Sequence, residues 1–119
     1  MKIFLTLITI FIFTVSLAAQ STATDYLQAG NDFYSDGKYQ AAIKQFTVGL
    51  KLEPRNLELL VLRAESHLQK GNLSLSLADC NKAIAIDSRY GKAYKIRGAI
   101  ASRQNKFEAD RKRSCRERV

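Results

Sequence analysis

The sequence contains few of the residues from which enzymatic and metal sites are built. Of its 119 residues, one is histidine (His67), two are cysteine (Cys80 and Cys115) and none is tryptophan. A catalytic nucleophile and base cannot be assembled around one histidine that is spaced for packing, and a structural zinc site takes more cysteine or histidine ligands than these. No glycine-rich phosphate-binding loop occurs either. We therefore predict a protein that is not an enzyme and has no metal or cofactor.

Proline is almost absent too, and Pro54 is its single occurrence. Segments rich in Ala, Leu, Lys and Gln favour helices, and apolar residues recur with helical spacing, as at Tyr39, Ile43 and Phe46. We expect a first helix that is capped by Thr24 or Asp25 and ends before residue 36. Further helices are expected over residues 38–52, 57–70, 73–86, 92–103 and 106 onward. Turns at 36–37, 53–54, 71–72, 87–88 and 104–105 separate them. Turns this short make neighbouring helices antiparallel.

The first 19 residues differ in composition from the rest. After Lys2, the stretch Ile3–Leu17 is mostly apolar. It has the length of a signal-peptide core and is short for a membrane span, which needs roughly 20 apolar residues. We predict a signal peptide over residues 1–19, cleaved after Ala18 or Ala19, and an exported protein: periplasmic or secreted, or in the endoplasmic reticulum lumen of a eukaryote. An uncleaved membrane anchor is the alternative; after cleavage we expect no stable membrane span.

The positive charge is concentrated at the C-terminal end. Residues 20–90 hold eight Lys or Arg against eight Asp or Glu, whereas residues 91–119 hold ten against three. Such an end suits an acidic partner, and four residues are candidates for polyanion binding: Arg111, Lys112, Arg113 and Arg116. The alternative is a solvated helix face. We expect no nucleic acid, because no aromatic residues interleave with these charges.

Similar residues recur at a spacing of 34 positions. The matching sets are Tyr26, Leu60 and Tyr94; Gly30, Ala64 and Gly98; Tyr39, Leu73 and Phe107. A fixed period of this length indicates stacked helix pairs. Small residues within it suggest close helix crossings, so we predict that Gly30 packs near Ala42, and that Gly49 and Gly98 also lie at close contacts.

At these residues the chain resembles the tetratricopeptide repeat family. The matching stretches are 26–34 and 37–43, together with Phe46, Leu50 and Pro54. The resemblance implies an all-α solenoid of antiparallel helix pairs, with full repeats at 23–56 and 57–90 and a divergent or partial third repeat at 91–119. In the third repeat, polar residues Asp110, Ser114 and Glu117 replace packing residues. Its basic end is therefore a polar terminal helix covering the stack, a partly disordered tail or a truncated repeat.

The family resemblance also implies a binding surface on the first helix of each repeat. By position, its candidate residues are Leu27, Asn31, Tyr34, Val61, Leu62, Glu65, Leu68, Lys92, Lys95, Ile96 and Ala99. An apolar floor with a basic end suits a helix or extended peptide with acidic residues at one end. The alternative is that these are ordinary exposed helix positions. The prediction is an exported adaptor that binds another protein or peptide.

One subfamily grips chaperone C-terminal carboxylates with five polar groove residues. Only Asn31 and Lys92 match that set, while Leu27, Leu62 and Ile96 replace the others, which argues against binding of that kind. A periplasmic or lumenal chaperone or co-chaperone that holds unfolded segments is the first alternative, because signal and repeats together resemble the amino-terminal part of DnaJ-type co-chaperones. Polyanion binding by the basic end is the second alternative.

His67 and Cys80 both fall on packing positions of the period. His67 is in register with Phe33, and Cys80 with Phe46. We predict a partly buried packing histidine rather than a ligand or a general base. Since cysteine often behaves as a small apolar residue, we also predict that Cys80 is a buried free thiol.

Overall fold

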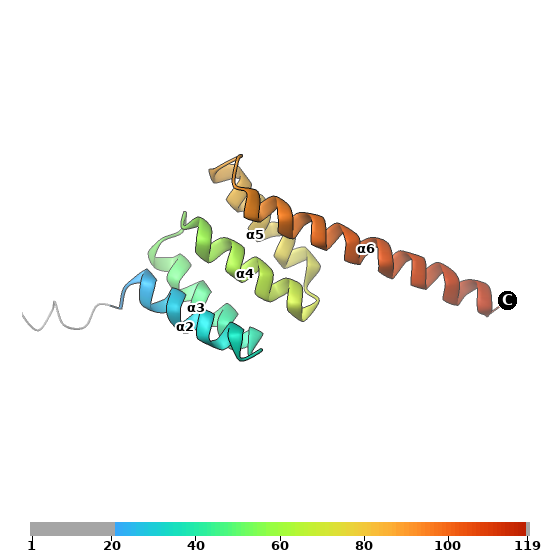
Figure 1. Cartoon of the computed structure of the whole chain (residues 1–119), viewed down its shortest axis with the longest axis horizontal. Coiled ribbons are helices and arrows are strands. Elements are labelled where there is room, and N and C mark those ends of the chain that lie inside the picture. The colour runs from blue at the N-terminus through green and yellow to red at the C-terminus, as the bar shows by residue number, and fades with distance from the viewer. Residues whose placement is uncertain (1–20, 119) are drawn as a thin grey trace, which may run out of the picture.

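The computed structural model describes residues 21–118, and the predicted signal peptide falls outside them. Five helices and no strands make up this part of the chain: α2 (Ala23–Ser35), α3 (Tyr39–Leu52), α4 (Leu57–Lys70), α5 (Leu73–Ile86) and α6 (Gly91–Glu117). Successive helices pack side by side, and α6 extends well past the others (Figure 1). The predicted all-α solenoid of antiparallel helix pairs is confirmed.

Side chains at the start of α2 and α4 satisfy backbone groups that have no partner within the helix. Thr22 precedes α2, and its hydroxyl accepts a bond of 3.4 Å from the N–H of Asp25, whose carboxylate accepts one of 2.7 Å from the N–H of Thr22. This reciprocal capping box begins α2 earlier than the predicted caps at Thr24 or Asp25. At α4, the Asn56 side chain accepts a bond of 3.1 Å from the N–H of Leu59.

The turns within the two helix pairs depend on glycine. Gly37 joins α2 to α3 with a φ of 74°, and Gly71 joins α4 to α5 with a φ of 84°. Residues with a β-carbon rarely adopt this left-handed conformation. The two glycines are 34 positions apart, so the period includes the turn as well as the helices.

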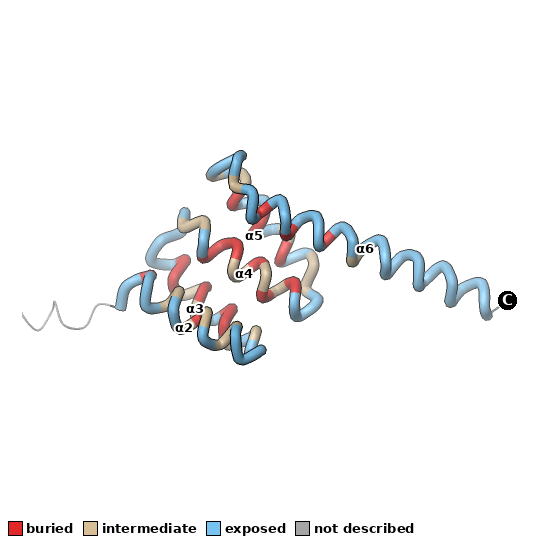
Figure 2. Tube along the Cα trace, in the orientation of Figure 1, coloured by how far each residue is buried: buried red, intermediate tan, exposed pale blue. Residues whose placement is uncertain are grey.

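A continuous apolar core runs through all five helices. Its fully buried large side chains include Phe46, Leu59, Leu60 and Ile100. Buried positions therefore follow the stack and reach α6 only in its first half (Figure 2). Cys80 is 0% exposed, which confirms the prediction that it is buried. Burial and the charge of Asp79 raise the pKa of its thiol to about 11.

Close helix contacts explain two of the three glycines for which they were predicted. A β-carbon at Gly30 would lie 2.3 Å from the ring of Phe46, and one at Gly49 would lie 2.9 Å from Leu59. The atoms that a β-carbon at Gly30 would meet first belong to Phe46, which the sequence analysis did not name. The prediction for Gly98 is wrong, because nothing lies within 4 Å of a β-carbon added there.

An ion pair joins the middle helices. Arg63 of α4 donates from Nε and Nη2 to the two carboxylate oxygens of Asp79 in α5, each bond 2.7 Å long. Nη1 of Arg63 also donates to the hydroxyl of Thr47 in α3 over 3.2 Å. Asp79 is only 4% exposed, and the paired geometry stabilises a carboxylate in that environment. Three consecutive helices are thereby fixed to one another.

The predicted turn at residues 104–105 is wrong, because α6 runs without interruption from Gly91 to Glu117. Asn105 occupies the position that Gly37 and Gly71 occupy in the earlier repeats, and no residue other than glycine has a positive φ in the described part of the chain. Without a left-handed residue there, helix-favouring residues continue the helix. Residues 106–117 are therefore helical but extend away from the stack instead of covering it (Figure 1).

Candidate functional site

A groove of about 410 Å³ lies between α4 and α6. Both helices begin a repeat, and the 34-residue period places the same side of each toward this space. The lining includes all eight candidate residues from the second and third repeats: Val61, Leu62, Glu65, Leu68, Lys92, Lys95, Ile96 and Ala99. We refer to this space as the α4–α6 groove.

The α4–α6 groove has an apolar floor and a polar rim. Val61, Leu68 and Ile96 are 3%, 5% and 8% exposed, so they form the floor and also join the core. Lys92 and Lys95 are exposed on the α6 side. A ligand in this groove would meet apolar surface below and positive charge along α6.

The three candidates from the first repeat lie farther from this space. Leu27, Asn31 and Tyr34 are partly buried, and none of them lines the α4–α6 groove. Tyr34 nevertheless lies beside Glu65 of the groove. The pKa of the Tyr34 hydroxyl is raised to about 12. Burial is the larger cause, and the negative charge of the neighbouring Glu65 carboxylate adds to it. Tyr34 thus extends the surface toward α2, and both Tyr34 and Leu27 pack against the core.

Two groove residues were missed from the sequence, Gln69 and Arg103. Arg103 of α6 donates from Nη1 to the backbone carbonyl of Leu68, near the C-terminal end of α4. A cation is favoured there, because the last carbonyls of a helix lack partners within the helix. Arg103 therefore fixes α6 to α4 at one end of the groove. The helix expected over residues 92–103 already included Arg103, so its spacing of four positions from Ala99 could have identified it.

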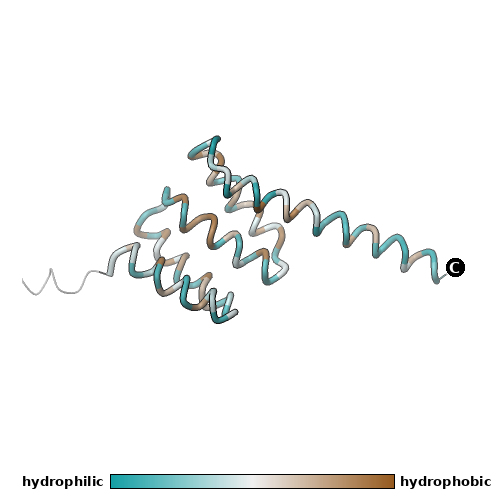
Figure 3. The backbone as a smooth tube through the Cα atoms, in the orientation of Figure 1, coloured by the Kyte–Doolittle hydropathy of each residue, from teal (hydrophilic) through white to brown (hydrophobic). Residues whose placement is uncertain are grey.

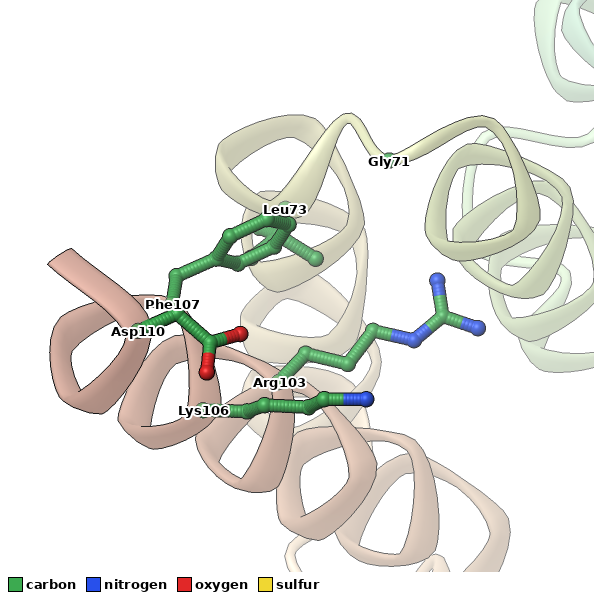
Figure 4. A pocket seen from close by; sticks show the side chains of 6 residues that line it. All are labelled: Gly71, Leu73, Arg103, Lys106, Phe107 and Asp110. Atoms are coloured by element: carbon green, nitrogen blue, oxygen red, sulfur yellow. The ribbon is translucent and has the colours of Figure 1, made fainter. Parts of the chain in front are cut away.

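A second hollow, of about 380 Å³, opens where α6 passes the turn between α4 and α5. Figure 4 shows the ring of Phe107 over Leu73, with Arg103 and Lys106 extending from α6 toward the side of Gly71. Phe107 was expected to begin a second helix of the third repeat. It lies instead on the continuous α6 and is 66% exposed.

The candidate polyanion residues lie on the part of α6 beyond the stack. Arg111, Lys112, Arg113 and Arg116 are all exposed. Figure 3 shows this half of α6 as mostly hydrophilic. The four side chains are therefore accessible, although they are interspersed with Glu108, Asp110 and Glu117.

The chemistry-bearing residues elsewhere do not form a reactive cluster. His67 is partly buried, as predicted, and its Nδ1 is buried without a partner in the described part of the chain. Burial is the main cause that lowers the pKa of His67. The positive charges of Arg63 and Lys70 lower it further, whereas the negative charge of Asp79 acts in the opposite direction. Within residues 21–118, no three His, Cys, Asp or Glu residues are grouped to hold a metal ion. No helix in that range is both long enough and apolar enough to span a membrane.

Comparison with known sequences finds relatives among larger proteins, although no family model matches. The chain is 36% identical over 85 residues to RNA polymerase II-associated protein 3 of Rattus norvegicus, and the aligned region covers 71% of this chain and 13% of that relative. It is 34% identical over 83 residues to the DnaJ homolog subfamily C member 7 homolog of Dictyostelium discoideum, and the aligned region covers 66% of this chain and 15% of that relative. The chain thus spans a small fraction of these curated relatives.

Comparison with solved structures finds the same architecture. The first TPR of Spaghetti (RPAP3), bound to the HSP90 peptide SRMEEVD, superposes with a TM-score of 0.68 at 33% identity, over 73% of this chain and 69% of that one. The second TPR of Spaghetti, bound to the same peptide, gives 0.68 at 31% identity over 74% and 82%.

Proposed function

Because the chain belongs to the tetratricopeptide repeat family, we propose that it is a non-enzymatic adaptor that binds a peptide or helix of another protein in the α4–α6 groove. The proposal rests on the combination of an apolar floor and a positively charged rim in the groove. Partly exposed Leu62 and exposed Ala99, above the buried floor, offer apolar surface to one or two apolar side chains of the partner, and Lys92 and Lys95 attract acidic residues beside them. The partner is therefore an acidic segment with apolar anchors.

The peptides held by the structural neighbours are acidic too, since SRMEEVD contains two Glu and one Asp. The chain differs from the carboxylate-gripping subfamily, because Leu27, Leu62 and Ile96 stand at three of the five polar positions of that subfamily. Ile96 is 8% exposed and has no donor to offer a carboxylate. We therefore propose that this groove recognises apolar and acidic side chains within a peptide rather than its terminal carboxylate.

Binding of the peptide SRMEEVD, with a free or an amidated C-terminus, tests this proposal. We expect both forms to bind with affinities that differ by less than about threefold, since only Asn31 and Lys92 of the five carboxylate-binding positions are retained. Fluorescence anisotropy measures both affinities. The Ala99→Asp and Lys92→Glu variants change exposed residues of the groove and should each weaken binding about tenfold or more.

The matched control is Arg111→Glu, which makes the same charge change on the same helix outside the groove. This variant should bind the peptide as the unmodified chain does. A large loss of affinity on amidation would show terminal-carboxylate recognition and contradict the proposed mode. Equal losses of peptide affinity in Lys92→Glu and Arg111→Glu would show that the interaction is only a long-range charge attraction.

We further propose that the adaptor is exported, on the composition of residues 1–19. The support is the apolar stretch Ile3–Leu17 followed by small residues. Expression of the full chain followed by intact-mass measurement of the extracytoplasmic fraction tests this. A mass without residues 1–18 or 1–19 is expected, and a mass that retains them argues against cleavage.

Two other roles have specific support. The similarity to a DnaJ homolog favours a co-chaperone role, in which the apolar floor holds unfolded segments; suppression of aggregation of several unrelated clients would indicate it. Exposed Arg111, Lys112, Arg113 and Arg116 favour polyanion binding, for which deletion of residues 111–119 should abolish retention on heparin.

A further inference from the structure

The first half of α6 presents a second face, separate from the α4–α6 groove. Tyr94, Arg97, Gly98 and Ala101 recur with helical spacing and share one side of α6. All four are exposed, whereas Ala93, Ile96 and Ile100 on another side of the helix are buried. We call these four exposed residues the Tyr94 face.

The equivalent face of α4 is covered by a helix. The residues 34 positions earlier are Leu60, Arg63, Ala64 and His67. Leu60 is 2% exposed and Ala64 is 0% exposed, while Tyr94 is 45% exposed. The Ser76 hydroxyl of α5 donates to the carbonyl of Ala64 over 2.7 Å, so α5 lies directly on this face of α4. The Tyr94 face is the same surface without its second helix.

Charge explains why residues 106–117 do not cover the Tyr94 face. Arg97 is equivalent to Arg63, whose partner is Asp79. The residue 34 positions after Asp79 is Arg113. If residues 106–117 folded back like α5, two arginines would meet where the second repeat has an ion pair, and Asp110 would replace the buried Ser76. In the described part of the chain no acidic side chain pairs with Arg97, which stacks on Tyr94 at 5.7 Å.

The open space beside Gly98 also indicates that a helix could pack on the Tyr94 face. In the first repeat, the ring of Phe46 fills the space beside Gly30, within 2.3 Å of where a β-carbon would be. Gly98 is in register with Gly30, and the corresponding space beside it is open. The missing helix would therefore place a large apolar side chain next to Gly98 and an acidic residue immediately before it, as Asp79 precedes Cys80.

We propose that the Tyr94 face binds an amphipathic helix of another protein, which pairs a carboxylate with Arg97 and packs a large apolar side chain over Gly98. Such a helix completes the third repeat in trans. A second copy of this chain fits less well, because two Tyr94 faces in contact would bring Arg97 of each copy together. The surface is distinct from the α4–α6 groove, so the chain could hold two partners at once.

The chain's own α5 provides the probe. A lactam-bridged helical peptide with the sequence of residues 73–86 and the change C80F carries Asp79 opposite Arg97 and a phenylalanine opposite Gly98. We expect the full chain to bind it with amide chemical-shift changes centred on residues 94–101. The D79N form of the peptide should bind about tenfold more weakly or worse, because a charge-assisted bidentate pair is lost.

Variants of the full chain complete the test. Arg97→Gln should weaken binding as D79N does, and the matched control Arg111→Gln, on the same helix beyond this face, should not. Gly98→Leu should abolish binding by filling the open space while leaving the chain folded. Equal binding of the D79N peptide, shifts centred on Val61 and Ile96, or a homodimer that Gly98→Leu dissociates would each overturn the proposal. None of these variants alters the α4–α6 groove, so groove binding is measured independently.

Discussion

Asp79 accepts two hydrogen bonds of 2.7 Å from Arg63, and the pair connects α4 to α5. The side chains are 6% and 18% exposed. Because each charge is removed from water only in the presence of the other, loss of one leaves the other without compensation. The pair therefore contributes to the specific packing of the second repeat.

We predict that Asp79→Ala lowers the free energy of unfolding by about 3 kcal/mol, since the Arg63 charge stays largely buried without its partner. Urea denaturation monitored by circular dichroism measures the change. The matched control is Asp36→Ala, which removes the exposed Asp36–Lys38 pair of 3.3 Å. We expect no measurable change there, because exposed pairs contribute little. Equal effects of the two substitutions would contradict the role given to burial.

Gly30 and Gly98 occupy the same repeat position in opposite surroundings, and we predict opposite effects of alanine. Gly30→Ala should destabilise the chain by about 1–3 kcal/mol, because the new β-carbon overlaps the ring of Phe46. Gly98→Ala should stabilise it by up to about 1 kcal/mol through helix propensity, since the space there is open. Thermal unfolding of both variants checks the two signs, and destabilisation at Gly98 would indicate a neighbour that the structure does not place there.

The 34-residue period is sufficient to predict the stacked pairs and the buried Cys80, whereas the candidate residues of α4 and α6 came from the resemblance to the family. The period fails where one residue changes the backbone: Asn105 stands in the register of Gly37 and Gly71, and asparagine is compatible with either a turn or a helix. The contact of Arg103 with the Leu68 carbonyl was also not predicted, because a repeat period does not specify a bond between a side chain and another helix. Leu27 does not line the groove and packs against the core instead, which the repeat pattern did not indicate.

We predict that Asn105→Gly weakens the outer half of α6. Glycine inside a helix costs about 1 kcal/mol relative to alanine, and residues 108–117 have few contacts with the stack to offset that loss. Amide hydrogen exchange should become faster over residues 106–117 while rates in α2 to α5 stay the same. Asn105→Ala is the control and should slow exchange in the same segment. Unchanged exchange in both variants would mean that this segment is not helical in solution.

The stability of the folded chain depends on pH through the partly buried His67. Burial lowers the pKa of its imidazole below the ordinary value of 6.5, and the positive charges of Arg63 and Lys70 act in the same direction against Asp79. The folded state therefore takes up a proton less readily than the unfolded state. The stability that depends on neutral His67 is present above pH 6.5 and is lost as the pH falls through the lower pKa of the folded state.

We predict that His67→Phe reduces this acid-dependent loss of stability. Phenylalanine stands at the equivalent position of the first repeat, as Phe33, and the buried Nδ1 of His67 has no hydrogen-bond partner among residues 21–118 that the substitution would remove. The free energy of unfolding, measured by urea denaturation at intervals from pH 7.5 to 5, should fall less steeply in the variant. Carboxylates titrate in both proteins, so the difference between the two curves isolates His67. Parallel curves would show that the imidazole is hydrated or protonated in the folded chain.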